Sequence, residues 1–371
     1  MTVRKVLLVA NSAYNILHFR KALWKALQEA DFKVYALAPA DGFEGDLESA
    51  GIEFQPLPEL KPYGRFLPSE LRLYRKLLKV YQALEPDVIL HFTIKPNLLG
   101  SIAASKLGLA SVANITGLGT TWITTSIQRR MIEVLYRQCL PAASAVVAQN
   151  EIDIKELQQI GVQAKSWHHV PGSGIDLNHF QPRSRTASSA FKFLYIGRML
   201  IDKGLRELFQ AWQQILNIIP DAELELLGEY DEEHPRCLDE STWNEGLSQE
   251  RVRHRSYQDD VRPFIQNADV VILPSYREGV PRSLLEALAM KRPIISTNTP
   301  GCRELAIPHQ TGWQVPTHSS ARLAEAMLDA YQAPSQLREQ FGDQGRQLVA
   351  NKYDAELIAK HYLDFIRSLL G

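Results

Sequence analysis

The sequence predicts an α/β protein with two domains, each a doubly wound parallel sheet. Short apolar runs, typical of strands buried on both faces, alternate with amphipathic helical segments along most of the chain. A polar stretch with proline and glycine interrupts this alternation near the middle, and the alternation then restarts. A chain of 371 residues is long enough for two cores. We therefore expect two Rossmann-like domains that face each other across a cleft.

The first domain is predicted to span residues 1–170. Its expected strands are 6–10, 33–38, 51–54, 88–92, 111–114 and 145–148, and its main helices are 19–30, 71–84 and 126–139. Between the first strand and helix, residues 11–20 contain no glycine. This stretch is therefore expected to be a turn that does not cradle a nucleotide's pyrophosphate.

Residues 171–190 are predicted to be the linker, and residues 191–353 the second domain. Its expected strands are 191–196, 223–228, 252–256, 270–273 and 293–296, with helices at 204–219, 260–266 and 284–290 and one beginning in 301–306. The last helix, 354–371, is expected to pack back onto the first domain.

Composition excludes several classes of protein. The formal net charge is −1, and the chain has no basic-aromatic stripe, so a nucleic-acid partner is not expected. Three scattered cysteines predict reduced thiols in a cytoplasmic protein, with no zinc site and no disulfide frame. The sequence contains no apolar run long enough to predict a membrane span, and the apolar run near the N-terminus is too short for a signal peptide.

A first cluster of candidate site residues follows the predicted strand 191–196. Gly197, Arg198, Lys203 and Gly204 lie where a doubly wound sheet binds ligands. Arginine offers a planar fork and lysine a mobile charge, a combination suited to a diphosphate. Two solvated cations beside a strand–helix turn explain these residues equally well.

A second cluster follows the predicted strand 270–273. Glu278 lies in a loop, Ser283 is expected to cap the next helix, and Glu286 lies in that helix. Glu286 can accept two hydroxyl groups side by side, as the ribose of a nucleotide offers them. Alternatively, Ser283 and Glu286 form a capping box that needs no ligand. Taken together, the two clusters predict a nucleotide-sugar site.

These two motifs, Gly197-Arg198…Lys203-Gly204 and the stretch from Glu278 to Glu286, resemble glycosyltransferase family 4, whose fold is GT-B. The resemblance covers nearly the whole chain. The segments 18–20, 116–119, 273–279 and 301–304 are similar to a bacterial branch of that family, which adds an N-acetylhexosamine to a polyprenyl-diphosphate-linked sugar.

The resemblance implies roles for the residues of the second domain. Arg198, Lys203 and Glu278 would be catalytic, with the two cations on the donor diphosphate and Glu278 on the transferred sugar, while Glu286 holds the ribose. The donor-binding set is Gly197, Arg198, Lys203, Arg255, Tyr257, Glu278, Gly279, Val280, Pro281, Arg282, Ser283 and Glu286. Such enzymes retain anomeric configuration and need neither metal nor cofactor. Thr116 stands where many relatives have a histidine, which puts a histidine-assisted mechanism in doubt.

A third cluster is predicted at the carboxyl ends of the first domain's strands, where an acceptor that carries a diphosphate would meet His18, Arg20 and Lys95. The predicted acceptor-binding residues are Asn15, His18, Arg20, Lys95, Asn97, Thr116, Gly117 and Gly119. The alternative is that His18 and Arg20 merely begin a helix.

Residues 61–140 hold 11 basic and 4 acidic residues. Arg72, Arg75, Lys76 and Lys79 alternate with apolar residues in one predicted helix, and Arg129, Arg130 and Arg137 do so in another. Basic amphipathic helices bind anionic leaflets, although solvated helix faces also have this pattern. The lipid acceptor implied by the resemblance favours a peripheral position on the inner face of the cytoplasmic membrane.

The predicted function is transfer of a hexose or N-acetylhexosamine, with retention, from a UDP-sugar to a polyprenyl-diphosphate-linked glycan in surface polysaccharide or glycoprotein synthesis. UDP-GalNAc and UDP-GlcNAc are the favoured donors. Alternatives are a transferase to a soluble acceptor, a UDP-sugar epimerase, and a non-catalytic scaffold that binds nucleotide sugars. The complete set of Arg198, Lys203, Glu278 and Glu286 argues against the scaffold.

Overall fold

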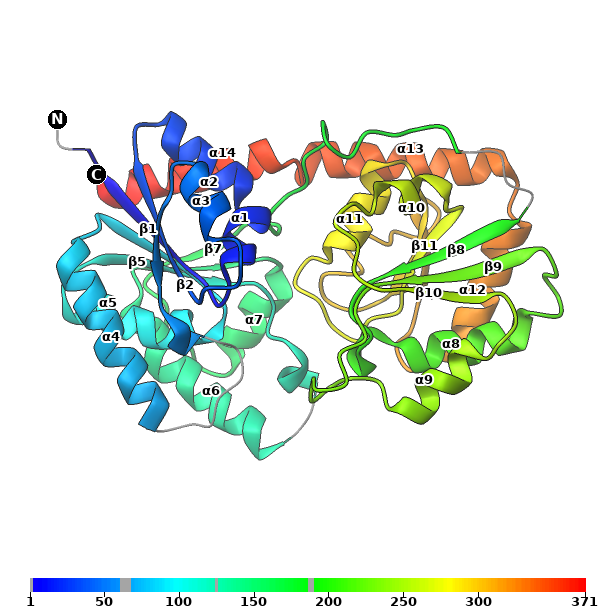
Figure 1. Cartoon of the computed structure of the whole chain (residues 1–371), viewed down its shortest axis with the longest axis horizontal. Coiled ribbons are helices and arrows are strands. Elements are labelled where there is room, and N and C mark those ends of the chain that lie inside the picture. Colours follow the sequence, from blue (N-terminus) through cyan, green and yellow to red (C-terminus); the bar gives the residue numbers. More distant parts are fainter. Residues whose placement is uncertain (1–2, 61–67, 124–125, 186–189) are drawn as a thin grey trace. The chain divides into compact units, whose positions relative to one another are not determined.

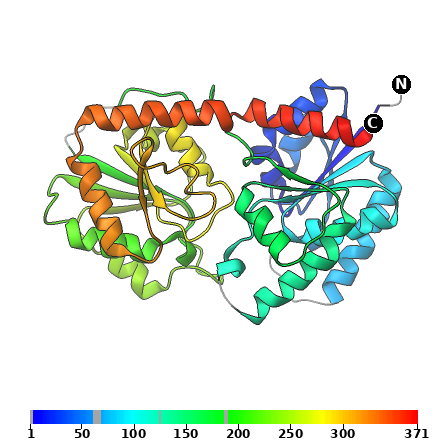
Figure 2. The same cartoon turned by 180° about the vertical axis from the view of Figure 1, so that it is seen from behind.

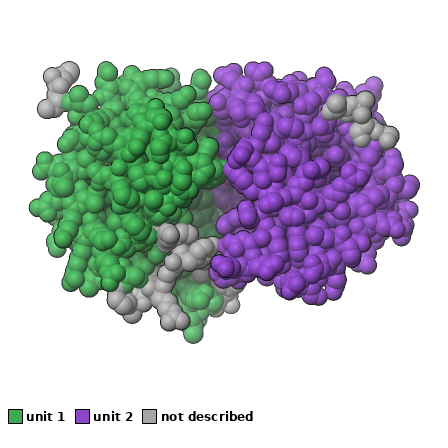
Figure 3. Space-filling view, viewed as in Figure 1, with its two compact units in different colours: residues 1–174, 355–371 green, residues 175–354 purple. Residues whose placement is uncertain are grey.

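The computed structural model describes residues 3–60, 68–123, 126–185 and 190–371. In it the chain divides into two compact units (Figure 3). Unit 1 joins Met1–Gly174 to Ala355–Gly371, and unit 2 is the continuous stretch Ile175–Asp354. Each unit has its own sheet and its own core, and each is described by itself.

Unit 1 is built on a seven-stranded parallel sheet with the order β3-β2-β1-β4-β5-β6-β7 (Figure 1). Its strands are β1 (Lys5–Val9), β2 (Lys33–Ala38), β3 (Glu53–Pro56), β4 (Val88–Phe92), β5 (Ala110–Ile115), β6 (Ala145–Ala148) and β7 (Trp167–His169). The direction of winding changes between β1 and β4. The carboxyl ends of these two strands therefore form the position where doubly wound sheets bind ligands.

Helices cover both faces of this sheet. The helices are α1 (Ala13–Phe19), α2 (Lys21–Glu29), α3 (Glu44–Ser49), α4 (Pro68–Leu84), α5 (Ser101–Lys106), α6 (Ile127–Cys139), α7 (Glu151–Gln159) and α14 (Ala355–Leu370), with short turns η1 (Pro58–Leu60), η2 (Pro96–Gly100), η3 (Thr120–Ile123) and η4 (Leu140–Ala142). Apolar side chains of α1, α2, α3 and α14 pack on one face, and those of α4 to α7 on the other. The helix at the end of the chain is thus part of the core of unit 1.

Unit 2 is built on a six-stranded parallel sheet with the order β10-β9-β8-β11-β12-β13. Its strands are β8 (Phe191–Ile196), β9 (Ala222–Leu227), β10 (Val252–Arg255), β11 (Val270–Leu273), β12 (Ile294–Thr297) and β13 (Gly312–Val315). The direction of winding changes between β8 and β11. The loops after these two strands are those that carry the two sequence clusters of this unit.

The helices of unit 2 complete its core. They are η5 (Ile201–Lys203), α8 (Leu205–Ile215), α9 (Glu240–Leu247), α10 (Arg262–Asn267), α11 (Arg282–Ala289), α12 (Ser320–Gln332) and α13 (Ser335–Lys352). α12 packs against α8 and β13, and α13 packs against α11, on the side seen in Figure 2. Trp212 of α8 is completely buried and is among the largest side chains of this core.

The structure confirms the two parallel sheets, but several local predictions are wrong. Residues 11–20 are mostly helical, because Ser12 caps α1 by accepting a hydrogen bond from the Asn15 N–H at 3.1 Å. Residues 301–306 form turns, not the start of a helix. Strands β7 and β13 were not predicted, since they are short edge strands with half-buried polar and aromatic residues.

Candidate functional site

The loops that follow β8 and β11 are in direct contact. Gly204, at the end of η5, has a left-handed backbone with φ 74°. A Cβ atom at this position would lie 2.1 Å from the carbonyl oxygen of Pro274. Only glycine permits both this conformation and this approach. The turn 197–204 is therefore locked against the start of the loop that holds Glu278.

This contact brings together the three residues predicted to be catalytic. The ammonium group of Lys203 donates a hydrogen bond to the Glu278 carboxylate, and the two side chains are 22% and 14% exposed. Arg198 is exposed, and its backbone carbonyl accepts a hydrogen bond from the Tyr195 hydroxyl at 2.9 Å. Burial raises the pKa of the Tyr195 hydroxyl. The negative charge of Glu278 raises this pKa further, whereas the positive charge of Arg198 lowers it. Both charges thus lie close to the same buried phenol.

The second carboxylate, Glu286, lies in α11 and is buried. The Arg282 Nε donates a hydrogen bond to Glu286 Oε1 at 2.9 Å. Burial raises the pKa of Glu286, against the lowering effect of the Arg282 charge. The predicted capping box is wrong, because Pro281 occupies the N-cap and Ser283 lies inside the helix.

The loop after β12 packs against the loop of Gly279, Val280 and Pro281. Gly301 has φ 82°, and a Cβ atom there would lie 2.2 Å from the Gly279 carbonyl oxygen. The Glu278 N–H also donates to the Pro300 carbonyl oxygen at 3.3 Å. The loops after β8 and β12 therefore both contact the loop after β11 and support the position of Glu278.

The predicted donor-binding residues Arg255, the last residue of β10, and Tyr257, just after it, differ in their surroundings. Arg255 turns to Glu225, whose Oε1 accepts from the Arg255 Nε at 2.8 Å, and the Arg255 carbonyl accepts from the Gly228 N–H at 3.0 Å. Tyr257 is exposed. Gly228 closely contacts Gly197, because a Cβ atom at Gly228 would lie 2.1 Å from the Gly197 carbonyl oxygen. Backbone groups, more than the Arg255 side chain, link this edge to Gly197.

Sequence reasoning missed the ion pair that supports the turn after β8. Asp202 is buried and pairs with Arg236. The Asp202 carbonyl oxygen accepts from the Tyr276 N–H at 2.8 Å and from the Ser275 hydroxyl at 3.1 Å. The chain around Arg236 pairs with the turn after β8, since the Ile201 N–H donates to the Arg236 carbonyl at 3.0 Å. Asp202 adjoins Lys203 in sequence, but no local pattern indicates Arg236.

The Tyr276 side chain forms a further support that was not predicted. Its hydroxyl donates to the two carboxylate oxygens of Glu207 at 2.9 and 2.8 Å. The Glu207 carboxylate lies 3.6 Å from His318 Nδ1, and the His318 ring lies 3.9 Å from that of Tyr276. The loop after β11 is thus tied to α8 and to the segment after β13.

Each of the three carboxylates at this edge faces a cation. Glu278 faces Lys203, Glu286 faces Arg282, and Asp202 faces Arg236. Within the described ranges, no group of three His, Cys, Asp or Glu side chains is arranged to hold a metal ion. Each of these three anions is matched by a neighbouring cation, and Arg198 adds a further positive charge to the site.

In unit 1, the predicted acceptor residues on α1 and α2 differ in exposure. His18 is exposed and packs against the rings of Tyr14 and Phe43, with centres 4.4 and 5.5 Å away. Asn15 lies in the first turn of α1. Arg20 lies between the two helices and is only 5% exposed, with its guanidinium 4.2 Å from the centre of the Phe92 ring. The Arg20 charge is therefore held close to the end of β4.

The remaining predicted acceptor residues follow β4 and β5. Lys95 forms an ion pair with Glu70 at 3.2 Å. Asn97 is buried, and its Nδ2 donates to the Asn114 carbonyl at 2.8 Å, while its buried Oδ1 has no hydrogen-bond partner among the described residues. Thr116, Gly117 and Gly119 lie in the loop after β5, where the two glycines have φ of 120° and 70°. Thr116, Gly117 and Gly119 thus follow the carboxyl end of β5, the neighbour of β4 in this sheet.

α14 reaches the same edge from the end of the chain. The Tyr362 hydroxyl donates a hydrogen bond to Asn114 Oδ1 at 2.8 Å, and the Asn114 Nδ2 donates to the His91 carbonyl at 2.9 Å. Burial raises the pKa of Tyr362 to about 12, against the lowering effect of the Arg20 charge. His91 is itself buried, with its pKa lowered by burial to about 3, and its ring contacts the Tyr81 hydroxyl at 2.9 Å. These residues form a neutral, hydrogen-bonded support beneath the loops.

Comparisons with known families match each unit separately. Residues 178–348 match the family model of group 1 glycosyl transferases. Residues 19–172 match the model of the glycosyl transferase 4-like domain. The two matched ranges fall within unit 2 and unit 1, respectively.

Curated relatives match most of the chain. An N,N'-diacetylbacillosaminyl-diphospho-undecaprenol alpha-1,3-N-acetylgalactosaminyltransferase of Campylobacter jejuni is 26% identical and covers 96% of each chain. The capsular polysaccharide biosynthesis glycosyltransferase CapM of Staphylococcus aureus is 22% identical, covering 78% of this chain and 79% of its own.

Solved structures have the same fold over the whole chain. Anabaena HepE, in complex with UDP and glucose, superposes with a TM-score of 0.79 at 18% identity over 98% of this chain and 100% of its own. A sucrose-phosphate synthase of Thermosynechococcus elongatus gives a TM-score of 0.82 at 20% identity, covering 99% of both chains. With both units matched, the protein belongs to the group 1 glycosyltransferases, family 4, and has their GT-B fold.

Proposed function

We propose that this glycosyltransferase moves a hexose or N-acetylhexosamine, with retention, from a UDP-sugar to a polyprenyl-diphosphate-linked sugar. The favoured donors are UDP-GalNAc and UDP-GlcNAc. The observation that carries the proposal is the convergence of Arg198, Lys203 and Glu278 at the switch point of unit 2. Two cations suit a diphosphate, and a carboxylate suits sugar hydroxyls. The names of the Campylobacter and Staphylococcus relatives support a role in surface glycan synthesis.

In the proposed reaction, the acceptor hydroxyl oxygen forms a bond to the anomeric carbon as the bond from that carbon to the diphosphate breaks. Attack on the face from which the diphosphate leaves retains configuration. Arg198 and Lys203 offset the negative charge that develops on the departing UDP, and the hydroxyl proton passes to a diphosphate oxygen of that UDP. Glu286, beside Arg282, accepts the ribose hydroxyls.

We assign the acceptor to unit 1 in this proposal. His18, Lys95 and the loop of Thr116 to Gly119 belong to the segments that follow β1, β4 and β5 of its sheet. Arg20 adds a buried positive charge near the end of β4, and the unsatisfied Asn97 Oδ1 offers a hydrogen-bond acceptor. Positive charge at a switch point suits a diphosphate, and here it would be that of the lipid-linked acceptor. Such an acceptor places the enzyme peripherally at the inner face of the cytoplasmic membrane.

The test is UDP release from UDP-GalNAc, UDP-GlcNAc, UDP-galactose and UDP-glucose, with and without a short-chain polyprenyl-diphosphate sugar, in EDTA. Release that depends on the lipid-linked acceptor supports the proposal and identifies the donor. Donor epimerisation without UDP release supports an epimerase, and release with a soluble sugar supports a soluble acceptor. UDP binding without turnover of any substrate supports a scaffold, and absence of UDP binding overturns the assignment of Arg198, Lys203 and Glu286.

A further inference from the structure

Helices α4 and α6 lie on the same face of the unit 1 sheet. Ile89 of β4 belongs to the core beneath α4, and Ala113 of β5 belongs to the core beneath α6. Ile89 pairs with Ser111, two residues before Ala113, so the Ile89 and Ala113 side chains point to the same face. The outer sides of α4 and α6 therefore both point away from this face, as Figure 1 shows.

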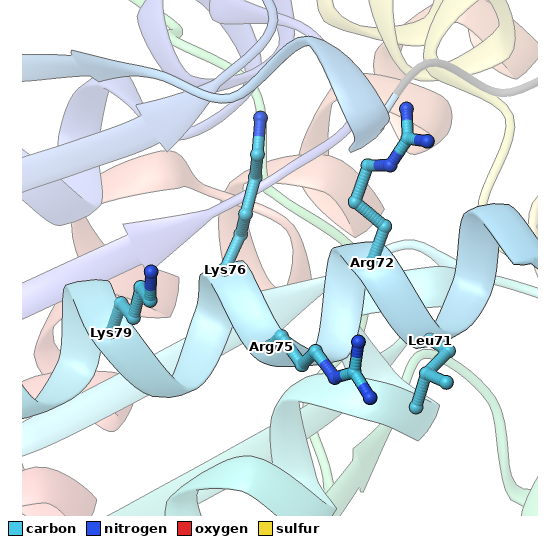
Figure 4. A pocket seen from close by; sticks show the side chains of 5 residues that line it. All are labelled: Leu71, Arg72, Arg75, Lys76 and Lys79. Carbon is cyan, nitrogen blue, oxygen red and sulfur yellow. The ribbon is translucent and has the colours of Figure 1, made fainter.

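The outer side of α4 is positively charged. Arg72, Arg75, Lys76 and Lys79 have the spacing of neighbours on one helix face, and together with Leu71 they line an open hollow of about 470 Å³ (Figure 4). Lys76 pairs with Glu59. Arg75 and Lys79, however, have no ion-pair partner in the part of the chain that the structure describes. The face thus keeps uncompensated positive charge.

In contrast to α4, the outer side of α6 exposes apolar side chains. Ile127, Met131 and Val134 follow one another along one face and are 87%, 42% and 37% exposed. Arg130 and Arg137 are exposed on the same helix. Such a combination of exposed aliphatic and basic side chains is unusual for a helix that faces only water.

Not every cation of α6 takes part. The Arg129 Nε donates to Glu133 Oε1 at 2.8 Å, and its Nη1 donates to the Trp122 carbonyl at 2.9 Å. Arg129 thus stabilises the start of α6. The sequence alone did not distinguish Arg129 from its neighbour Arg130. Arg129 is therefore engaged within the protein, whereas Arg130 and Arg137 are exposed and can contact a partner.

We propose that the outer sides of α4 and α6 form a membrane-contact surface, made by Arg72, Arg75, Lys79, Ile127, Arg130 and Met131, which docks on an anionic lipid leaflet. Charge complementarity selects this partner, because aliphatic side chains enter the acyl boundary while lysine and arginine remain among the anionic headgroups. The choice of a lipid partner rests on the proposed function, since a lipid-linked acceptor is presented at a membrane. No helix within the described ranges is long and apolar enough to span a bilayer.

The test measures sedimentation of the full-length protein with vesicles of phosphatidylcholine, with and without phosphatidylglycerol. Wild-type protein is expected to bind only the anionic vesicles and to dissociate as salt is added. R75Q/K79Q is expected to lower the partition coefficient about 30-fold, since each charge near the surface contributes about fivefold. The matched control K21Q/K25Q removes two exposed charges from α2, on the other face of the sheet, and should bind as wild type.

The apolar contribution has its own pair of variants. I127S/M131S is expected to lower the partition coefficient at least about tenfold, because both side chains would otherwise leave water. I218S/L337S removes two exposed apolar side chains from unit 2 and should bind as wild type. Circular dichroism of all four variants confirms that the fold is kept.

The membrane-contact surface is wrong if wild-type protein ignores anionic vesicles, or if R75Q/K79Q and I127S/M131S both bind like wild type. A wild-type dimer that I127S/M131S converts to a monomer would assign the surface to a second copy instead. Transfer to a short-chain acceptor in solution separates the two proposals. Retained transfer without vesicle binding overturns only the surface, whereas vesicle binding without transfer to any acceptor overturns only the proposed function.

Discussion

Lys203 and Glu278 form an ion pair that connects the loops after β8 and β11, the two strands at the switch point of unit 2. Both side chains are largely buried, so each strongly influences the other's position. In the proposed reaction a donor diphosphate takes the place of Glu278 as the partner of Lys203. Glu278 is then available to the hydroxyls of the sugar. The pair thus keeps both groups in position before the donor arrives.

Replacement of Lys203 by alanine is expected to lower turnover by about 100-fold or more, because a preorganised positive charge on the leaving group is lost. The measurement is kcat from UDP release together with thermal unfolding. Lys192→Ala is the matched control, since Lys192 also pairs with a buried glutamate of unit 2, Glu225, at 3.5 Å. Wild-type turnover of Lys203→Ala would refute the catalytic assignment.

Arg236 is expected to act through the turn that holds Arg198 and Lys203. Arg236→Gln removes the charge that faces the buried Asp202, and loss of a hydrogen bond between charged groups costs about 1.5–3 kcal/mol. We expect kcat/KM for the donor to fall about tenfold to 100-fold. Arg206→Gln, which breaks an exposed pair with Asp239, should leave kcat/KM within about twofold. Equal kinetics of the two variants would show that the Asp202–Arg236 pair does not position the turn.

Glu286 gives a pH dependence whose sign follows from its burial. Its folded pKa is raised above the ordinary 4.5, so the folded state holds the proton more tightly than the unfolded state. The contribution to stability is present below pH 4.5 and is lost as the pH rises through the folded pKa. Glu286→Gln lacks this loss, so its free energy of unfolding should exceed that of wild type increasingly as pH rises. The opposite trend in denaturant titrations would mean that the Arg282 charge outweighs burial.

Tyr362→Phe tests the attachment of α14 to the edge of unit 1. The variant keeps the ring but removes the hydroxyl that donates to Asn114, leaving a buried acceptor unsatisfied. The free energy of unfolding of unit 1 is expected to fall by about 1–3 kcal/mol. Ser368→Ala removes an exposed hydroxyl from the same helix and should change stability by less than about 0.5 kcal/mol. Equal stability of the two variants would contradict a structural role for the Tyr362 hydroxyl.

The sequence predicts most of the sheets because strands that are buried on both faces consist mainly of apolar residues. β4 and β6 are uninterrupted buried runs, and their bounds were predicted without error. β7 and β13 lie at sheet edges, where Trp167 and Gln314 are only half buried. The few half-buried residues of these two strands carry little signal, whereas β10, also an edge strand, is predicted at 252–256.

The candidate site divides in the same way. Gly197, Arg198, Lys203, Glu278 and Glu286 form local motifs, and all lie in the unit 2 loops and helix where the motifs predict them. Arg236 and Glu207 support the site through contacts with residues 34 and 69 positions away. Ser283 failed as a cap because the helix begins at Arg282, two residues before the predicted start at 284. Contacts between distant segments depend on the finished fold, which no single motif encodes.

Unit 1 is discontinuous, and this has a consequence for biosynthesis. The ribosome makes residues 1–174, then all of unit 2, and only afterwards the helix that supplies Ile358, Tyr362 and Ile366 to the first core. Unit 2 is continuous and can complete its core during translation, whereas the apolar side chains of α2 that pack against α14 stay uncovered until the last helix is made. The first half of the polypeptide is therefore the part that exposes apolar surface longest, which is the kind of surface that chaperones bind. It also completes its folding last.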